Sequence, residues 1–125
     1  MILDTNAISA LFEADARLVQ LLSSAPKHEI PTIVIGEYRY GLARSRLRKT
    51  IVPMLDGLVA KSTVLAITAS TAVIYAETRE RLRAAGTPVG ENDVWISALA
   101  LEHGLEVVSR DTDFDRVAGL RRRAW

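Results

Sequence analysis

The sequence predicts an α/β fold, in which helices cover both faces of a mostly parallel sheet. One observation behind this prediction is that short extended runs alternate with helical patterns along the whole chain. A second is the composition, because the chain has 125 residues, of which 49% are hydrophobic and 25% are charged. These values match one ordinary globular domain that can bury most of its apolar surface. Residues 1–125 are therefore expected to form a single domain.

In the first third of the chain, two strands and three helices are expected. Short apolar runs predict the strands, and apolar residues spaced three and four apart predict the helices. Thr5 or Asn6 is expected to cap the first helix and Thr32 the third, because their side-chain oxygens can accept from a free backbone N–H. The expected order is a strand over Met1 to Asp4, a helix carrying Ile8, Leu11 and Phe12, a helix carrying Leu18, Leu21 and Leu22 that Pro26 stops, a strand over His28 to Pro31, and a helix carrying Ile33, Glu37, Tyr40 and Gly41.

The rest of the chain is expected to continue this alternation. Glycines mark two helix ends, since Gly86 and Gly104 follow periodic segments and Pro88 lies just beyond the first. Thr63 to Ile67 is short and β-branched, which is typical of a strand. The expected order is a helix over Arg44 to Lys61, a strand over Thr63 to Ile67, a helix over Ala69 to Ala85, a helix from Asp93 to His103, a strand over Leu105 to Ser109, a short helix over Thr112 to Val117, and a short strand around Arg121 to Trp125.

Four acidic residues lie at the edges of apolar runs and are far apart in the sequence. Asp4 and Asp111 follow expected strands, Asp93 begins a helix, and Glu37 lies one turn into a helix that follows a strand. In parallel α/β folds, ligands bind beyond the carboxyl ends of the strands, so all four side chains can reach one pocket. Converging carboxylates lose hydration and repel one another, and a raised pKa or a bound cation relieves this. The four acids therefore predict a metal site.

The available ligand atoms limit which metal and which chemistry are expected. The chain has no cysteine, which excludes zinc-thiolate sites, so any metal must be held by oxygen or by His28 and His103. Carboxylate oxygens favour Mg²⁺ or Mn²⁺, which commonly engage phosphate oxygens. Such an ion polarises a phosphodiester and activates water, so hydrolysis of nucleic acid is predicted. Asn6 and Ser109 are expected to orient Asp4 and the attacking water.

No part of the sequence predicts export or membrane insertion. Met1 leads into an apolar run without a basic segment before it, and no stretch approaches the roughly 20 apolar residues that span a bilayer. The chain is therefore expected to be cytoplasmic, and its lack of cysteine agrees with a reducing compartment. Its net charge of +1 does not by itself indicate a polyanionic partner.

Five short motifs follow one another along nearly the whole chain. They are Met1-Ile2-Leu3-Asp4-Thr5-Asn6, Glu37-Tyr38-Arg39-Tyr40-Gly41, Gly90-Glu91-Asn92-Asp93 with Ile96, Ala98 and Ala100 after it, Glu102-His103-Gly104-Leu105, and Ser109-Arg110-Asp111-Thr112-Asp113-Phe114. In these motifs, their order and their spacing, the chain resembles PIN-domain nucleases, and specifically the VapC toxins of bacterial type II toxin–antitoxin systems.

The resemblance implies a PIN-like three-layer fold with about four to five strands and about six to seven helices. It also implies a Mg²⁺- or Mn²⁺-dependent endoribonuclease that acts on structured RNA such as tRNA or rRNA, forms a homodimer and is neutralised by a VapB antitoxin. The family's acids correspond to Asp4, Glu37, Asp93 and Asp111, with Asp113 as the alternative to Asp111. The family's hydroxyl and amide helpers correspond to Thr5, Asn6 and Ser109, and Ser109 stands where threonine is commoner.

The chain has a basic segment between Tyr38 and Lys49, which consists of Arg39, Arg44, Arg46, Arg48 and Lys49. The basic segment, which has no acid within it, is expected to contact RNA phosphates or an acidic antitoxin tail, and a solvated face is the alternative. One other functional class is a non-catalytic PIN-like module that only binds a partner. The other is a haloacid-dehalogenase-like phosphatase, in which Asn6 would stand where a second Asp is needed as the acid.

Overall fold

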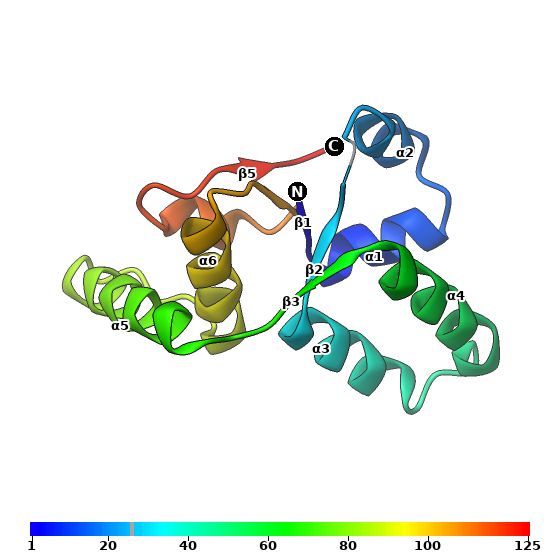
Figure 1. Cartoon of the computed structure of the whole chain (residues 1–125), viewed down its shortest axis with the longest axis horizontal. Helices are drawn as coiled ribbons and strands as arrows, with labels where there is room; N and C mark the ends of the chain where they lie inside the picture. The colour runs from blue at the N-terminus through cyan, green and yellow to red at the C-terminus, as the bar shows by residue number, and fades with distance from the viewer. Residues whose placement is uncertain (26) are drawn as a thin grey trace.

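Five short strands form one fully parallel sheet in the order β3-β2-β1-β4-β5. The computed structural model describes residues 1–25 and 27–125, and Figure 1 shows β1, β2 and β3 passing through the middle of the molecule. This arrangement confirms the predicted parallel sheet. The strands are β1 (Ile2–Leu3), β2 (Glu29–Pro31), β3 (Thr63–Leu65), β4 (Val107–Val108) and β5 (Arg122–Arg123).

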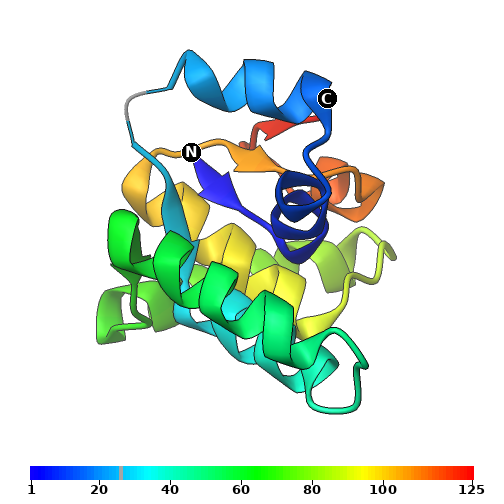
Figure 2. The same ribbon diagram turned by 90° about the vertical axis from the view of Figure 1, so that its right-hand side faces the viewer.

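Helices lie on both sides of the sheet, so the predicted three-layer α/β fold is confirmed. Figures 1 and 2 show α1 and α4 on one side of the strands and α5 and α6 on the other. Helix α3 contacts α1, α4 and α6, and therefore joins the two layers. Among the described residues, none of the helices is long and apolar enough to cross a membrane. The helices are α1 (Thr5–Phe12), α2 (Ala16–Ser23), α3 (Thr32–Leu42), α4 (Arg48–Lys61), α5 (Ala69–Ala84), α6 (Glu91–His103) and the 3₁₀ helix η1 (Thr112–Arg116).

The apolar core surrounds the three central strands. Both residues of β1 and both residues of β4 are fully buried, and so is Ile30 of β2. Strands of a parallel sheet are covered on both faces, which explains why these runs are continuously apolar instead of alternating with polar residues. The carboxyl ends of β1 and β4 are consequently held side by side by buried side chains.

Several expected element boundaries were wrong by a few residues. Helix α4 begins at Arg48 and not at Arg44. Ser45 Oγ accepts from the Leu47 backbone N–H at 3.1 Å, and this local turn competes with the helical hydrogen bond. Strand β3 ends at Leu65, two residues before the expected end. The last short helix is a 3₁₀ helix that ends at Arg116.

The expected helix caps also differ from those observed. Asp4 caps α1, because its backbone is extended and its Oδ1 accepts from the Thr5 N–H at 2.7 Å. Thr32 is the first residue of α3 and not its cap, and its hydroxyl donates to the Leu65 carbonyl at 3.1 Å. Helix α6 begins before Asp93, which lies in its first turn. Helix α2 ends at Ser23, and Pro26, its expected stop, lies outside the described residues.

Helix α4 places one fully buried side chain in the core, with the partly buried Leu58 and Val59 beside it, and this gives a testable prediction. Leu55 is its only buried residue and belongs to the main core, whereas the neighbouring Met54 is 41% exposed. Leu55→Ala is expected to lower the free energy of unfolding by about 2 to 5 kcal/mol, because it leaves a cavity in the core. Met54→Ala is expected to change it by less than about 1 kcal/mol. Urea denaturation of both variants measures this, and equal losses would contradict the assignment of Leu55 as the anchor.

Candidate metal centre

The acidic residues meet where the strand order of the sheet reverses. The chain passes from β1 to β2 and β3, and then returns to place β4 on the other side of β1. Ligands of open parallel sheets bind at such a switch point, beyond the carboxyl ends of the strands. Asp4 follows β1 directly, and Ser109 follows β4 directly. The fold therefore brings the two ends of the sequence together at this edge.

Asp4 is buried, with an exposed fraction of only 5%, and three residues donate hydrogen bonds to its carboxylate. Its Oδ2 accepts from Asn6 Nδ2 at 2.9 Å and from Ser109 Oγ at 2.8 Å, in addition to the Thr5 N–H on Oδ1. Asn6 Oδ1 accepts from the Arg110 N–H at 3.1 Å, which fixes the direction of the amide. The structure thus brings Thr5, Asn6 and Ser109 to Asp4, with Thr5 contributing its backbone.

The same contacts weigh against the phosphatase hypothesis. That chemistry needs a proton donor two residues after the nucleophilic Asp. The Asn6 amide donates to Asp4 and to Ser109 Oγ, both at 2.9 Å, and accepts from Arg110. Asn6 therefore positions Asp4 and has no acidic proton to donate.

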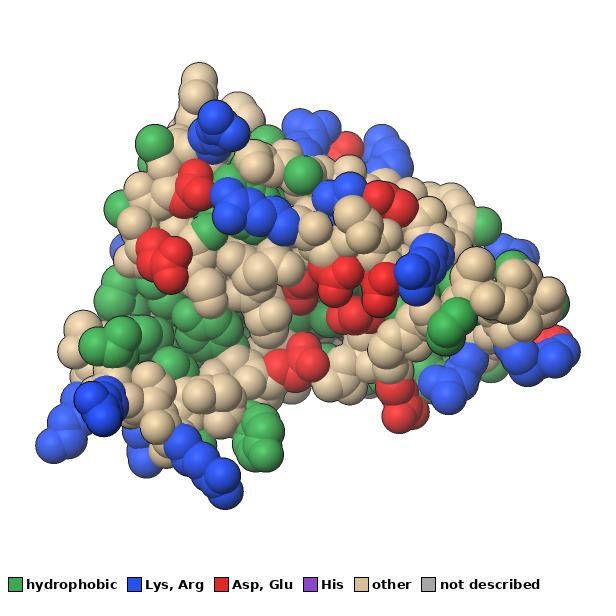
Figure 3. Space-filling view, turned by 180° about the vertical axis from the view of Figure 1, so that it is seen from behind, with side chains coloured by type: hydrophobic (Ala, Val, Ile, Leu, Met, Phe, Trp, Pro, Cys, Tyr) green, Lys and Arg blue, Asp and Glu red, His purple; other side chains and the backbone are tan. Residues whose placement is uncertain are grey.

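Three further carboxylates converge beside Asp4. One oxygen from each of Asp93, Asp111 and Asp113 lies within 4.8 Å of the others. Asp111 Oδ1 also accepts from the Asp113 N–H at 2.9 Å and caps η1. The structure brings both Asp111 and Asp113 to this cluster, although they were predicted as alternatives. Figure 3 shows the acidic side chains gathered near the middle of one face of the molecule.

Glu37 approaches the cluster from α3 and is held by Asn92. Asn92 Nδ2 donates to Glu37 Oε1 at 2.7 Å across the interface between α3 and α6. We define the acidic centre as Asp4, Glu37, Asp93, Asp111 and Asp113. No role for Asn92 was predicted from the sequence, in which the available signal was its place between two acids at the start of a helix.

The electrostatics show that these carboxylates share one site. Burial, together with the smaller effects of the charges on Asp4, Asp111, Glu37 and Asp113, raises the pKa of Asp93 to about 6. Burial likewise raises the pKa of Asp4, against the hydrogen bonds from Ser109 and Thr5 that lower it. The folded chain therefore holds several carboxylates in a place where their negative charge is unfavourable.

The chemistry of the donor set fits a hard divalent cation. The acidic centre offers carboxylate oxygens, which suit Mg²⁺ and Mn²⁺. His103 lies at the opposite end of α6 from Asp93, and His28 precedes the amino end of β2, whereas the acids lie beyond the carboxyl ends of the strands. Neither histidine joins the described acidic cluster. A cation among these oxygens would offset their mutual repulsion.

Two hollows adjoin the acidic centre and share Glu37. One has a volume of about 310 Å³ and is lined by Glu37 and residues 90–93. The other has a volume of about 520 Å³ and lies between α1 and α3. Its lining residues are Thr5, Asn6, Ser9, Glu37, Tyr38, Gly41 and Leu42. The acidic centre is therefore reached from an open surface.

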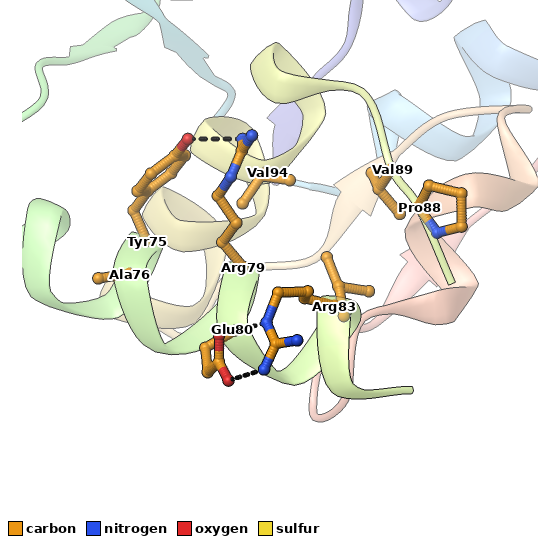
Figure 4. A pocket seen from close by; sticks show the side chains of 9 residues that line it. Tyr75, Ala76, Arg79, Glu80, Arg83, Pro88, Val89 and Val94 are labelled. Atoms are coloured by element: carbon orange, nitrogen blue, oxygen red, sulfur yellow. Dashed lines mark hydrogen bonds and ion pairs between the residues drawn. The ribbon is translucent and has the colours of Figure 1, made fainter. Parts of the chain in front are cut away.

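A larger hollow of about 570 Å³ between α5 and residues 88–94 does not include an acid of the centre. Figure 4 shows Arg79 pointing to Tyr75 and Arg83 pointing to Glu80 along its wall. The Arg79 Nη1 to Tyr75 Oη distance is 2.8 Å, and Arg83 donates twice to the Glu80 carboxylate. Its polar side chains thus pair with one another.

The basic segment lies at the α3–α4 end of the molecule. Arg39 forms an ion pair with Asp56 of α4, so the fold supplies an acid that the segment itself lacks. Arg39, Arg48 and Lys49 line a hollow of about 670 Å³ between α3 and α4. Figure 3 shows the Lys and Arg side chains of this end separated from the acidic side chains by hydrophobic and uncharged surface.

Comparison with protein families agrees with this geometry. The family model described as PIN domain matches residues 1–120. The chain belongs to the PIN domain family. This membership confirms the resemblance to PIN-domain nucleases that the sequence motifs indicated.

Individual PIN-domain relatives and structures are similar over most of their length. A tRNA(fMet)-specific endonuclease VapC from Shigella flexneri is 32% identical over 77% of this chain and 74% of the relative. Ribonuclease VapC2 from Haemophilus influenzae is 28% identical over 98% of this chain and 96% of the relative. The crystal structure of DNA-bound VapBC from Salmonella typhimurium matches with a TM-score of 0.87 at 27% identity, covering 99% of this chain and 96% of that chain. The predicted resemblance to VapC toxins is therefore confirmed.

The raised pKa of Asp93 predicts how stability depends on pH without added metal. Its pKa rises from 3.8 to about 6 on folding, so the folded chain binds the proton more tightly and loses stability as the pH rises through this window. Asp93→Asn removes this loss and is expected to stabilise the metal-free chain at pH 7 by roughly 1 kcal/mol, a value reduced for partial exposure to water.

Urea denaturation between pH 4 and pH 7 in EDTA measures this effect. Glu77→Gln, which changes an exposed carboxylate on α5, is the matched control and is expected to keep the wild-type pH dependence. A variant at Asp93 that is less stable than the wild-type chain at pH 7 would contradict the predicted repulsion.

Proposed function

We propose that this chain is a metal-dependent endoribonuclease, the toxin of a toxin–antitoxin pair, and that residues 1–125 act as one PIN domain. The observation that carries the proposal is the convergence of Asp93, Asp111 and Asp113 within 4.8 Å at the switch point of the sheet, next to Asp4. A cluster of this kind without a cation would cost stability, because its carboxylates repel one another. Membership of the PIN family and the ribonuclease names of the relatives support the same chemistry.

The residues that would hold Mg²⁺ or Mn²⁺ are those of the acidic centre. Asp93, Asp111 and Asp113 supply the closest group of oxygens, and Asp4 and Glu37 complete the set. When bound, a divalent cation supplies positive charge that polarises the scissile phosphodiester and favours ionisation of the attacking water. Asp93, whose pKa is raised to about 6 in the metal-free chain, would become fully ionised beside such a cation, because a nearby positive charge favours the carboxylate.

The neighbouring polar residues would keep the carboxylates in place as charge accumulates. Asn6 and Ser109 donate to the same oxygen of Asp4, which leaves that carboxylate with one orientation. Asn92 does the same for Glu37 from the first turn of α6. Groups that orient metal ligands in this way commonly affect metal affinity by about 10- to 100-fold.

The proposed substrate is RNA, with tRNA or rRNA as the class to test first. A relative with 32% identity is named a tRNA(fMet)-specific endonuclease, and other relatives are named ribonucleases. The open hollows beside Glu37 give a strand access to the acidic centre. We further propose a homodimer and a VapB-type antitoxin partner, since the similar Salmonella typhimurium structure is a VapBC complex.

The central experiment is cleavage of a purified tRNA and rRNA pool. The wild-type chain is expected to make discrete cuts with Mg²⁺ or Mn²⁺ and none in EDTA. Asp4→Asn and Asp93→Asn are expected to lower the cleavage rate by about 100-fold or more, because each removes an ionised oxygen from the metal set. Glu77→Gln is the control and is expected to retain the rate.

Each other result has a definite meaning. Cleavage that persists in EDTA or in both Asn variants would contradict the proposed site. Absence of RNA and DNA cleavage would favour the non-catalytic module, and cleavage of DNA alone would replace the proposed substrate.

The role of the basic segment is tested by the salt dependence of RNA binding. In an Asp93→Asn background, changing Arg44, Arg46 and Arg48 to Ala is expected to reduce the slope of log affinity against log salt by about 2, because three phosphate contacts are lost. The same changes at Arg79, Arg81 and Arg83 on α5 are the matched control. Equal slopes for the two triple variants would assign the basic segment to another partner or to a solvated face.

A further inference from the structure

The segment from Ser109 to Asp113 supplies three groups to the acidic centre, and its position therefore determines the geometry there. Ser109 Oγ donates to Asp4, and the Asp111 N–H donates to Ser109 Oγ at 3.0 Å. Asp111 and Asp113 provide two of the three clustered carboxylates. Arg110 lies within this segment, and its side chain reaches residues outside the acidic centre.

The Arg110 side chain contacts two residues that are distant in sequence. Its Nη2 lies 2.9 Å from Asp15 Oδ2, and its Cζ lies 4.4 Å from the centroid of the Trp125 ring. Trp125 Nε1 donates to the same Asp15 oxygen at 3.3 Å. The three side chains thus form one closed set of contacts, in which each member contacts the other two.

Asp15 is itself fixed by the connection between α1 and α2. Its Oδ1 accepts from the Arg17 and Leu18 backbone N–H groups and caps α2. Ala14, just before it, has a φ of 56°, which a residue other than glycine rarely adopts. Hydrogen bonds lower the pKa of Asp15, and the one from the Leu18 N–H has the largest effect, with a smaller one from Trp125. The carboxylate therefore stays charged beside Arg110.

The other end of this contact set is held by β5 and by the core. The Ser109 N–H donates to the Arg123 carbonyl at 3.1 Å, and Arg122 Nη1 donates to the Ser109 carbonyl at 3.0 Å. Arg122 also forms two hydrogen bonds of 2.8 Å with Asp115. Trp125 packs against the main apolar core. Residues 122–125 therefore hold the backbone of Ser109 as well as the side chain of Arg110.

We propose that Arg110, Asp15 and Trp125 form a positioning cluster that sets the Ser109–Asp113 segment and thereby tunes the metal affinity of the acidic centre. The coupling passes through the Arg110 backbone, because its N–H orients the Asn6 amide that in turn holds Asp4. Arg110 and Trp125 are positioning residues and do not contact the metal. The inference rests on the proposed function, since it assigns a regulator to the same metal site.

The test is Mn²⁺ binding by titration calorimetry, with amide hydrogen exchange measured in EDTA. Arg110→Met and Trp125→Ala are expected to weaken Mn²⁺ binding by about tenfold, the lower end of the effect of groups that orient ligands. Both variants are also expected to speed exchange at the Arg110 and Asp111 amides and not at amides within α5. Trp125→Phe keeps the ring under Arg110 and is expected to retain most of the affinity.

Arg83→Met is the matched control, because Arg83 also pairs with a carboxylate but lies on α5. Wild-type affinity and exchange in both Arg110→Met and Trp125→Ala would overturn the proposal, as would an equal loss in Arg83→Met. Exchange that rises throughout the chain would assign these residues to global stability and would also overturn it. Failure of the wild-type chain to bind Mn²⁺ would contradict the proposed function. In that case, the exchange rates in EDTA would still test whether Arg110 and Trp125 hold the Ser109–Asp113 segment in place.

Discussion

The mutual repulsion of the carboxylates in the acidic centre is the constraint on which the rest of this structure depends. Burial and neighbouring negative charges raise the pKa of Asp93 to about 6, so the folded chain holds these groups against an electrostatic cost. The apolar strands β1 and β4 provide the packing that offsets it, since all four of their residues are fully buried. A stable core thus maintains a site that would be unfavourable without a cation.

Neutral donors, and not cations of the protein, hold the most buried of these carboxylates. Asn6, Ser109 and the Thr5 N–H all donate to Asp4. An arginine at this place would neutralise the charge that a metal ion requires, whereas neutral donors fix the orientation and leave the charge available. The arginine that does lie nearby, Arg110, contributes its backbone N–H to the site and directs its guanidinium to Asp15 and Trp125.

The topology explains why acids from four separate parts of the chain meet. The reversal of strand order between β1 and β4 opens the edge of the sheet at the carboxyl ends of both strands. Helix α3 contacts α6 and brings Glu37 within reach of Asn92. The membership of the PIN family is consistent with this arrangement, because it covers residues 1–120 and so includes every member of the acidic centre.

The sequence by itself determined the alternation of strands and helices, the parallel sheet and the acids at the ends of apolar runs, because hydrophobic periodicity is a local property of the chain. Only the tertiary structure decided contacts across long separations, such as Ser109 with Asp4, which lie 105 residues apart. It also decided that Asp111 and Asp113 both join the cluster, and that Asp56 pairs with Arg39. Side-chain partners depend on how the layers pack, and no local pattern encodes which of several equivalent donors or acids will meet.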